Sequence, residues 1–480
     1  MLKGEAGGGI AVAPFVILLS YYKTGPRESR GKEAIVKIRT SLLRLSMVGA
    51  LSALAFAAGA QGLEDKVTIV TSYNKDMTGP FAAAFEKKYP GTKVEVQNRN
   101  TAAAVTFIQE TKSNPPDLFW ASAPDAFEVL KKNAMLQKYT PKAQGIATKA
   151  GSYPINDPDG YYIGFAASGY GIEYNTRYLK ANDLPAPKEW DDLKKPIYFG
   201  HVGISAPSRS GTTHLTVETI LQGEGWEKGW ATLLEIGGNL AQVSDRSFGV
   251  PDAVNSGQYG LGIVIDFFGL SGKASGFPVE FVYPTVTAIV PANIGIIKGA
   301  KNQKAAEAFI EFLLSEEGQQ ILFDPKIQRL PVRLATYDKA PAGFPNPFKN
   351  EKLGAGVKFD ADISEKRYEL VNSLFDRIIT FRLKELNAAW KAIHDTEKKL
   401  GAKAGPEAKK LLAEARRLAT AVPISGAEAN DTAIANSFHK VKKGETAAGR
   451  QAEFEQKWDQ AALKNYNDAK ALAEKAASAK

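Results

Sequence analysis

Short apolar runs alternate with longer amphipathic stretches from residue 67 to about residue 359. Strands that alternate with helices in this way are typical of an α/β fold with a parallel or mixed sheet. Each predicted strand leads into a polar loop, so these loops should collect at one edge of the sheet, where such folds bind ligands. In the first part of the chain the pattern predicts strands at 67–71, 92–96 and 118–121, with helices at 78–89 and ending near 132.

A Gly-rich apolar run at 163–175 predicts a long strand that leads out of this first unit. A second α/β unit opens with the proline-rich segment 184–190. The β-rich segment 285–297 then returns the chain to the first unit, and residues 305–322 predict one amphipathic helix. Within the second unit we expect a β-like run at 197–204, helices at 215–221 and 226–236, a turn at 246–250, and strands at 242–244 and 260–266.

The last part of the chain, residues 361–480, has a different pattern. It has few β-branched runs and is rich in Ala, Lys, Glu and Leu. Apolar residues from Val371 to Ile393 recur at helical spacing, and further helices are predicted at 406–420 and from about 446. We expect a helical extension that packs on the lobes or on itself, with its Lys and Glu side chains on a solvated face.

Residues 37–60 have the features of a cleavable export signal. Basic residues Lys37, Arg39 and Arg44 precede an apolar run at 47–57 and a small-residue cleavage site that ends at Ala60. The apolar run is too short for a stable membrane anchor, so we expect a soluble protein in a Gram-negative periplasm. A membrane-retained helix is the alternative. Because residues 1–35 precede this better-formed signal, we also expect that translation starts downstream of Met1.

Composition narrows the chemistry. The 480 residues contain no cysteine and four histidines, which excludes disulfides and disfavours a zinc site. The net charge of +9 falls to +4 without residues 1–60, with 53 Lys and Arg against 49 Asp and Glu. The remainder lacks a basic stripe with interleaved aromatic residues, so no nucleic acid is expected as a partner. We predict a monomer with no metal and no cofactor.

The polar loop between the run at 197–204 and the helix at 215–221 is the strongest candidate for a ligand site. Backbone N–H groups and the helix dipole favour an anion at such a helix start, and the glycine lets the backbone approach a ligand. The alternative is an ordinary capped helix, which needs only one or two such residues. The loop offers Ser208, Arg209, Ser210, Gly211, Thr212, Thr213 and His214.

The order and spacing of several segments resemble the periplasmic solute-binding proteins of ABC importers. These segments are PDLFWAS at 116–122, WDDL at 190–193, PSRSGTT at 207–213 and the helix at 305–322, with crossovers near 164–174 and 284–297. The nearest subset binds ferric iron, thiamine, polyamines or phosphorylated sugars. The resemblance covers roughly residues 65–335. It implies a two-lobed α/β fold with two crossovers, mixed sheets and a C-terminal helical extension, with lobe 1 at 61–168 and 286–360 and lobe 2 at 169–285.

The resemblance also implies ligand contacts outside the polar loop. Arg246 and Ser247 lie in a turn, and an arginine there is able to fork onto phosphate or carboxylate oxygens. Asp266 ends a strand and is able to accept hydrogen bonds from sugar hydroxyls. The structural alternatives are an arginine paired with an acid and an aspartate that caps a loop. In lobe 1 the expected contacts follow two strands and are Ser72, Tyr73, Asn74 and Ser122.

The expected ligand is a small anionic organic solute, namely a phosphorylated sugar, phosphoglycerate or a phosphonate, which the protein would deliver to an ABC permease. Ferric binders of this subset use adjacent tyrosines where this chain has Phe267 and Phe268, and polyamine binders need several carboxylates. Iron, thiamine and polyamines are therefore alternatives, as is a periplasmic sensor that contacts a membrane kinase. A hydrolase built on Ser208 or Ser210 with His214 lacks the usual motifs, so no catalytic residue is predicted.

Overall fold

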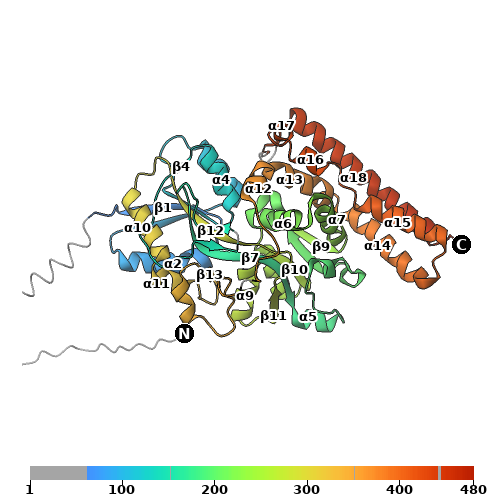
Figure 1. Ribbon diagram of the computed structural model, residues 1–480, viewed down its shortest axis with the longest axis horizontal. Coiled ribbons are helices and arrows are strands. Elements are labelled where there is room, and N and C mark those ends of the chain that lie inside the picture. The colour runs from blue at the N-terminus through green and yellow to red at the C-terminus, as the bar shows by residue number, and fades with distance from the viewer. Residues whose placement is uncertain (1–61, 152, 351, 440, 442–444, 480) are drawn as a thin grey trace, which may run out of the picture. The chain divides into compact units, whose positions relative to one another are not determined.

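A computed structural model describes residues 62–151, 153–350, 352–439, 441 and 445–479 (Figure 1). The predicted export signal and the residues before it lie outside these described ranges. Within the ranges, no helix combines the length and the apolar character needed to cross a lipid bilayer.

The first group of strands forms a mixed sheet of β1 (Lys66–Thr71), β2 (Lys93–Asn98), β3 (Leu118–Ala121) and β12 (Ile289–Ile297). β1 pairs in parallel with β2 and β3, whereas β12 runs antiparallel to β3. Val67 and Ile69 enter one apolar core and Val70 enters another, so both faces of β1 are covered. The predicted strands at 67–71, 92–96 and 118–121 are confirmed. Short strands at the margins are β4 (Leu136–Gln137), β5 (Lys149–Ala150), β6 (Tyr153–Pro154) and β13 (Leu330–Pro331).

The strand β7 (Ile163–Asn175) belongs to both strand groups, and its bounds confirm the predicted run. Up to Gly169 it pairs with β12, and from Tyr170 it pairs with β10. We call residues 62–169 and 286–350 lobe 1 and residues 170–285 lobe 2; the boundaries expected from the sequence stay predictions. The strands of lobe 2 are β8 (Val202–Ser205), β9 (Leu240–Ser244), β10 (Leu261–Ile265) and β11 (Val279–Val282).

Helices flank both groups of strands (Figure 1). The predicted helix at 226–236 is confirmed, and the one at 215–221 starts earlier than predicted, at Gly211. Lobe 1 has α2 (Lys75–Lys88), α3 (Thr101–Glu110), α4 (Pro124–Lys132), α10 (Gln303–Leu314) and α11 (Glu316–Ile321). Lobe 2 has α5 (Thr176–Ala181), α6 (Gly211–Glu224), α7 (Trp226–Gly237), α8 (Gly249–Ser256) and α9 (Asp266–Ala274).

Two sequence predictions need correction. The β-like run at 197–204 becomes a strand only at Val202, because Pro196 opens a 3-10 turn that runs to Tyr198. The single helix predicted at 305–322 is two helices. Ser315 adopts an extended backbone between them, and its hydroxyl accepts a hydrogen bond from the Gly318 N–H at 3.1 Å, so it ends α10 and caps α11.

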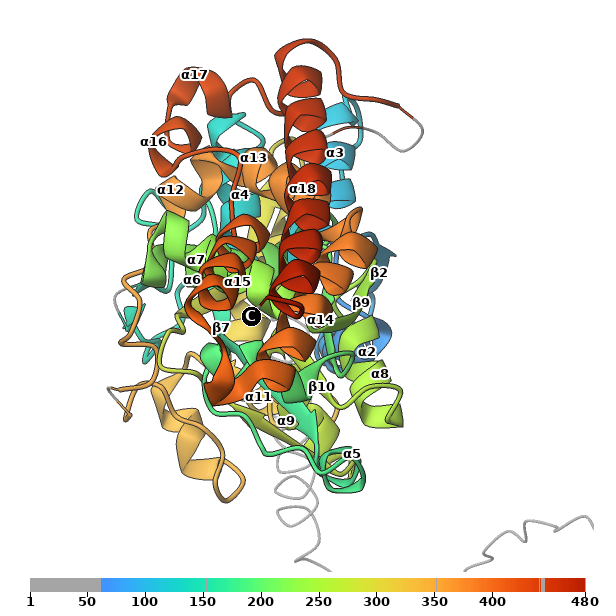
Figure 2. The same ribbon diagram turned by 90° about the vertical axis from the view of Figure 1, so that its right-hand side faces the viewer.

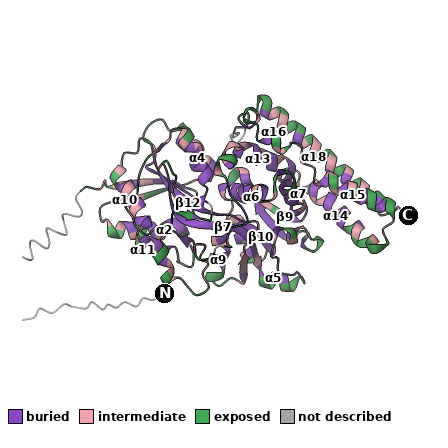
Figure 3. Ribbon diagram, viewed as in Figure 1, coloured by how far each residue is buried: buried purple, intermediate pink, exposed green. Residues whose placement is uncertain are grey.

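The extension, residues 361–479 where described, is helical as predicted. Its helices α14 (Leu383–Leu400), α15 (Pro406–Ala419) and α18 (Gly449–Ala476) pack against one another, and each has a buried and an exposed face (Figures 2 and 3). Trp390 and Trp458 share one apolar core with Trp230 of lobe 2, so the extension and lobe 2 are packed as one body. Its shorter helices are α12 (Ala361–Lys366), α13 (Tyr368–Phe375), α16 (Gly426–Ala429) and α17 (Thr432–Ala435).

Candidate functional site

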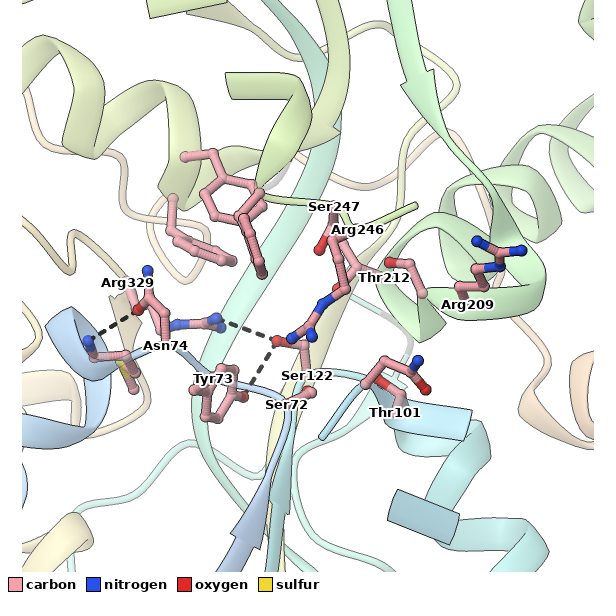
Figure 4. A pocket seen from close by; sticks show the side chains of 16 residues that line it. Ser72, Tyr73, Asn74, Thr101, Ser122, Arg209, Thr212, Arg246, Ser247 and Arg329 are labelled. Atoms are coloured by element: carbon pink, nitrogen blue, oxygen red, sulfur yellow. Dashed lines mark hydrogen bonds between the residues drawn. The ribbon is translucent and has the colours of Figure 1, made fainter. Parts of the chain in front are cut away.

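A pocket of about 520 Å³, including its open mouth, lies where loops and helix starts of the two lobes meet (Figure 4). Its enclosed part is small, about 40 Å³. The structure brings together around it nine of the residues singled out from the sequence, and their role as ligand contacts stays a prediction. They are Ser72, Tyr73, Asn74, Ser122, Arg209, Ser210, Thr212, Arg246 and Ser247.

Helix N-termini from both lobes point their polar ends at this pocket. Asn74 caps α2 by accepting from the Met77 N–H at 3.2 Å, and Asn100 caps α3 by accepting from the Ala103 N–H at 2.7 Å. Ser210 caps α6 in lobe 2. All three capping residues line the pocket. Because each helix start carries a partial positive charge, their convergence favours a negatively charged ligand.

Arg329 is the principal lining residue that the sequence analysis missed. Its side chain is fully buried between the rings of Tyr73 and Phe267, at 4.6 and 3.7 Å from their centroids. It donates to the Ser122 hydroxyl at 3.1 Å, while its Nε has no hydrogen-bond partner among the described residues. Arg329 stands among other polar and basic residues in the segment KIQRLPVR at 326–333, so no local pattern singles it out.

Tyr73 and Ser122 form a short relay with this arginine (Figure 4). The Ser122 hydroxyl donates to the Tyr73 hydroxyl oxygen at 3.2 Å and accepts from Arg329. Burial raises the pKa of Tyr73, and the positive charge of Arg329 only partly offsets that effect. Tyr73 is therefore a neutral phenol near neutral pH, which makes it a hydrogen-bonding group rather than an anionic ligand for a metal.

The other two arginines of the pocket differ from each other. Arg246 lies over the Phe248 ring at 4.8 Å and contacts the Asn98 amide oxygen of lobe 1 at 3.4 Å. No ion pair to Arg246 or Arg329 is found in the part of the chain that the structure describes. Arg209 instead forms an ion pair with Asp245, and Figure 4 shows it turned away from the centre.

Asp266 requires a correction, because it stands behind the pocket wall. Its carboxylate is fully buried and accepts hydrogen bonds from the Gly169 N–H at 2.7 Å and the Tyr283 hydroxyl at 2.9 Å. Burial raises its pKa to about 6, against the effect of these hydrogen bonds. The two residues that follow it, Phe267 and Phe268, line the pocket in its place.

The polar loop also contributes fewer contacts than expected. Because α6 starts at Gly211, successive side chains turn by about 100° and cannot all face one ligand. Thr213 is buried and its hydroxyl bonds to that of Ser205, while Ser208 is partly buried beside Asp376 of the extension. Gly211 has a packing role, because a Cβ there would lie 2.7 Å from the Ala123 Cβ of lobe 1.

The prediction for His214 is wrong. Its side chain is fully buried, with Nδ1 at 2.8 Å from the Asn372 amide oxygen and Nε2 at 3.1 Å from the Ser364 hydroxyl, both in the extension. It does not line the pocket, and no hydrogen bond joins it to the Ser208 or Ser210 hydroxyl in the described ranges. The geometry therefore gives no support to a serine–histidine pair.

Comparisons with known proteins agree with this architecture. Residues 113–353 match the family model described as "Bacterial extracellular solute-binding protein". Over 375 residues the chain is 31% identical to the phosphoglycerate transport regulatory protein PgtC of Salmonella typhimurium, covering 77% of this chain and 89% of that protein. It is 27% identical over 299 residues to the Fe(3+)-binding periplasmic protein of Serratia marcescens, covering 60% and 85% respectively.

Solved structures show the same fold. AfuA of Actinobacillus pleuropneumoniae, a periplasmic binding protein solved with fructose-6-phosphate bound, aligns with a TM-score of 0.58 at 23% identity, over 65% of this chain and 98% of its own. The apo ferric ion-binding protein A of Pasteurella haemolytica aligns with a TM-score of 0.53 at 19% identity, over 66% and 98%. These likenesses confirm the expected two-lobed binding-protein fold.

Proposed function

The chain belongs to the bacterial extracellular solute-binding protein family, and from this premise we propose that it captures a small anionic organic solute for an ABC importer. The ligand class is a phosphorylated sugar, a phosphoglycerate or a phosphonate. The protein holds this solute between its lobes in the periplasm and delivers it to a permease at the inner membrane. The Salmonella relative, named for phosphoglycerate transport, supports a phosphoglycerate.

The observation that carries this proposal is the character of the charges in the pocket. Arg329 and Arg246 both line it, and neither forms an ion pair among the described residues. The capped starts of α2, α3 and α6 add partial positive charge around the two guanidinium groups. The hydroxyls of Ser72, Ser122 and Thr212 supply further neutral donors. An anion with several oxygens satisfies this set of groups.

Capture uses the two lobes in turn. Lobe 1 contributes Tyr73, Ser122 and Arg329, and lobe 2 contributes Arg246 and Thr212. A solute that first binds to the groups of one lobe attracts the groups of the other lobe. Closure of the lobes then excludes water, which strengthens each charge-assisted hydrogen bond to the solute. The closed pair of lobes then presents a single shape to the permease.

The pocket disfavours ferric iron, the ligand in the printed name of the Serratia relative. A hard trivalent cation prefers oxygen anions, whereas the pocket places two guanidinium groups beside a phenol whose pKa is raised by burial. Phe267 and Phe268 occupy the wall where ferric binders of the subset that the sequence resembles place tyrosines.

Isothermal titration calorimetry tests the proposal. The chain from residue 61 onward would be titrated with 3-phosphoglycerate, fructose 6-phosphate and 2-aminoethylphosphonate, and in parallel with ferric citrate and spermidine. We expect saturable 1:1 binding of at least one phosphorus-containing anion, weakened by salt. Binding of ferric ion or spermidine, with none of the three phosphorus compounds, would overturn the ligand class.

A sensory role is the second candidate, because the Salmonella relative is named a transport regulatory protein. In that role the ligand-bound protein would contact a membrane sensor kinase instead of a permease, or in addition to one. Deleting the gene and complementing it with a binding-deficient variant separates the two. Loss of solute-induced transcription with uptake preserved would favour the sensor.

A further inference from the structure

Helices α12 and α13 of the extension lie between a helix of lobe 1 and a helix of lobe 2. α12 contacts α4 of lobe 1, and α13 contacts α6 of lobe 2. Figures 1 and 2 both show α12 beside α4, and Figure 1 shows α6 and α13 next to it. The extension therefore touches both halves of a molecule whose binding pocket also lies between the halves.

The contacts with lobe 2 are numerous and buried. Arg367 donates twice to the Glu218 carboxylate, at 2.8 Å each, and both side chains are inaccessible or nearly so. Gln222 is bonded to the backbone of Asp360 in both directions, at 2.7 and 3.0 Å. Together with the shared apolar core, these bonds fix the extension to lobe 2.

The polar contacts with lobe 1 are fewer, although the helix α12 packs closely against α4. The Ser364 hydroxyl lies 3.3 Å from an Asp125 carboxyl oxygen, and Glu365 forms an ion pair with Lys132, whose side chain is about half exposed. An exposed ion pair contributes little, and a single neutral hydrogen bond contributes modestly. The joint between the extension and lobe 1 is therefore the one that breaks first when the lobes separate.

This joint sits directly behind the pocket. Ser122 precedes α4, and Asp125 follows one turn later; Ser210 and Thr212 begin α6, and His214 follows in the same way. Asp125 and His214 both reach Ser364 of α12. The N-terminal ends of α4 and α6 thus face the ligand site, and the next turn of each helix contacts Ser364 of the extension.

We propose that α12 is a latch, anchored to lobe 2, whose contacts with α4 of lobe 1 hold the two lobes together around the pocket. This inference rests on the proposed capture of a solute between moving lobes. The latch lowers the free energy of the closed form before any ligand arrives, and it slows ligand release once the solute is bound. The Ser364–Asp125 and Glu365–Lys132 contacts form in the closed arrangement and part in the open one.

The absence of cysteine in the chain makes a distance measurement direct. Spin labels at Lys112→Cys in lobe 1 and Lys180→Cys in lobe 2, both at exposed positions, report the lobe separation by double electron–electron resonance. The latch variants are Ser364→Ala and the milder Lys132→Ala, made in the full chain because truncation would uncover the core shared with lobe 2. Lys366→Ala on the same helix is the matched control.

Both latch variants should shift the ligand-free distance distribution toward a wider separation. Lys132→Ala should leave the melting temperature nearly unchanged, whereas Ser364→Ala, which removes a buried hydroxyl bonded to His214 and Asp125, should lower it. With 3-phosphoglycerate as the probe, koff measured by stopped flow should rise roughly tenfold for Ser364→Ala. The Lys366→Ala control should match the parent protein in both readouts. Distributions that stay superimposable with the parent in Ser364→Ala and Lys132→Ala would overturn the latch.

The distance readout also separates this inference from the proposed ligand class. A shift toward wider separation in a protein that binds none of the three phosphorus compounds would leave the latch standing and remove the ligand class. Normal binding of 3-phosphoglycerate with unchanged distances would do the reverse. Collapse of Ser364→Ala on expression would leave the surface variant Lys132→Ala to decide the outcome.

Discussion

Two buried arginines in this protein have opposite surroundings. Arg367, where the extension meets lobe 2, is matched by the Glu218 carboxylate through two hydrogen bonds. Arg329, in the pocket, is also buried, but it rests between two aromatic rings and the hydroxyls of Ser122 and Ser168, with Asp266 nearby and no ion pair among the described residues. A buried charge with no counter-charge is costly to keep. The contrast assigns Arg367 to folding, and under the proposed function Arg329 is held ready for the negative charge of the ligand.

The largest expected effect comes from removing the matched arginine. Burial opposes ionisation of Glu218, and the charge and hydrogen bonds of Arg367 outweigh that effect, so the pKa of Glu218 lies below its ordinary value. Arg367→Ala leaves the buried Glu218 carboxylate without its counter-charge. It should therefore lower the unfolding free energy by about 3–5 kcal/mol, measured by urea denaturation. Arg382→Ala, which breaks the partly exposed pair with Asp459, should cost far less unfolding free energy. Equal losses of unfolding free energy in Arg367→Ala and Arg382→Ala would show that the buried ion pair matters no more for folding than the partly exposed one.

Arg329, which has no ion-pair partner among the described residues, should show the opposite result: its removal should affect ligand binding and not stability. Arg329→Met removes the buried charge and keeps an apolar side chain of similar length, so the unfolding free energy should be unchanged or higher. Affinity for the phosphorus-containing ligand should fall roughly 100-fold, about 2.7 kcal/mol, because a charge-assisted contact is lost. Arg209→Met is the matched control, since Arg209 lines the same pocket but is paired with Asp245. A destabilised Arg329→Met protein with normal affinity would assign Arg329 to folding.

Asp125, on the lobe 1 side of the latch, should make stability depend on pH. Burial raises its pKa to about 8, burial also lowers the pKa of the facing His214, and their 3.4 Å contact therefore joins two neutral groups. Since the folded-state pKa lies above the unfolded one, the unfolding free energy should fall as pH rises from about 4 to about 8. Glu218 and Arg367 also face this cluster, and the lowered pKa of His214 acts in the opposite direction below about pH 6.5.

Asp125→Asn keeps the shape and removes that titration. Relative to the parent protein, it should gain on the order of 2 kcal/mol between pH 5 and pH 8, measured by urea denaturation at each pH. Parallel pH profiles for the two proteins would show that Asp125 is ionised in the folded state.

The smallest expected effect tests how closely the lobes approach at the pocket. Gly211→Ala places a Cβ 2.7 Å from the Ala123 Cβ, so the start of α6 must move away from α4. We expect a loss of affinity of about fivefold, roughly 1 kcal/mol, with little change in stability. Ala123→Gly in the same chain should restore the affinity. A double variant as weak as the single one would place the effect within α6 rather than between the lobes.

The sequence predicted local structure better than side-chain direction. Strand and helix patterns have short periods, so β7 and α7 were identified closely. Ser210 and Thr212 were predicted at the pocket because a polar helix start has a local signature. His214 was misjudged because its partners, Ser364 and Asn372, are about 150 residues away. Arg329 was missed for the same reason, since only folding places it between Tyr73 and Phe267.

The strand β7 runs without a break from one lobe into the other. This strand exchanges its neighbour β12 for β10 between Gly169 and Tyr170, with no intervening loop to absorb a wide swing. At this position the Asp266 carboxylate accepts hydrogen bonds from the Gly169 N–H and from the Tyr283 hydroxyl, so it links the two groups. Any relative motion of the two lobes must therefore twist or bend β7 at this point, where the Gly169 amide is held by the Asp266 carboxylate.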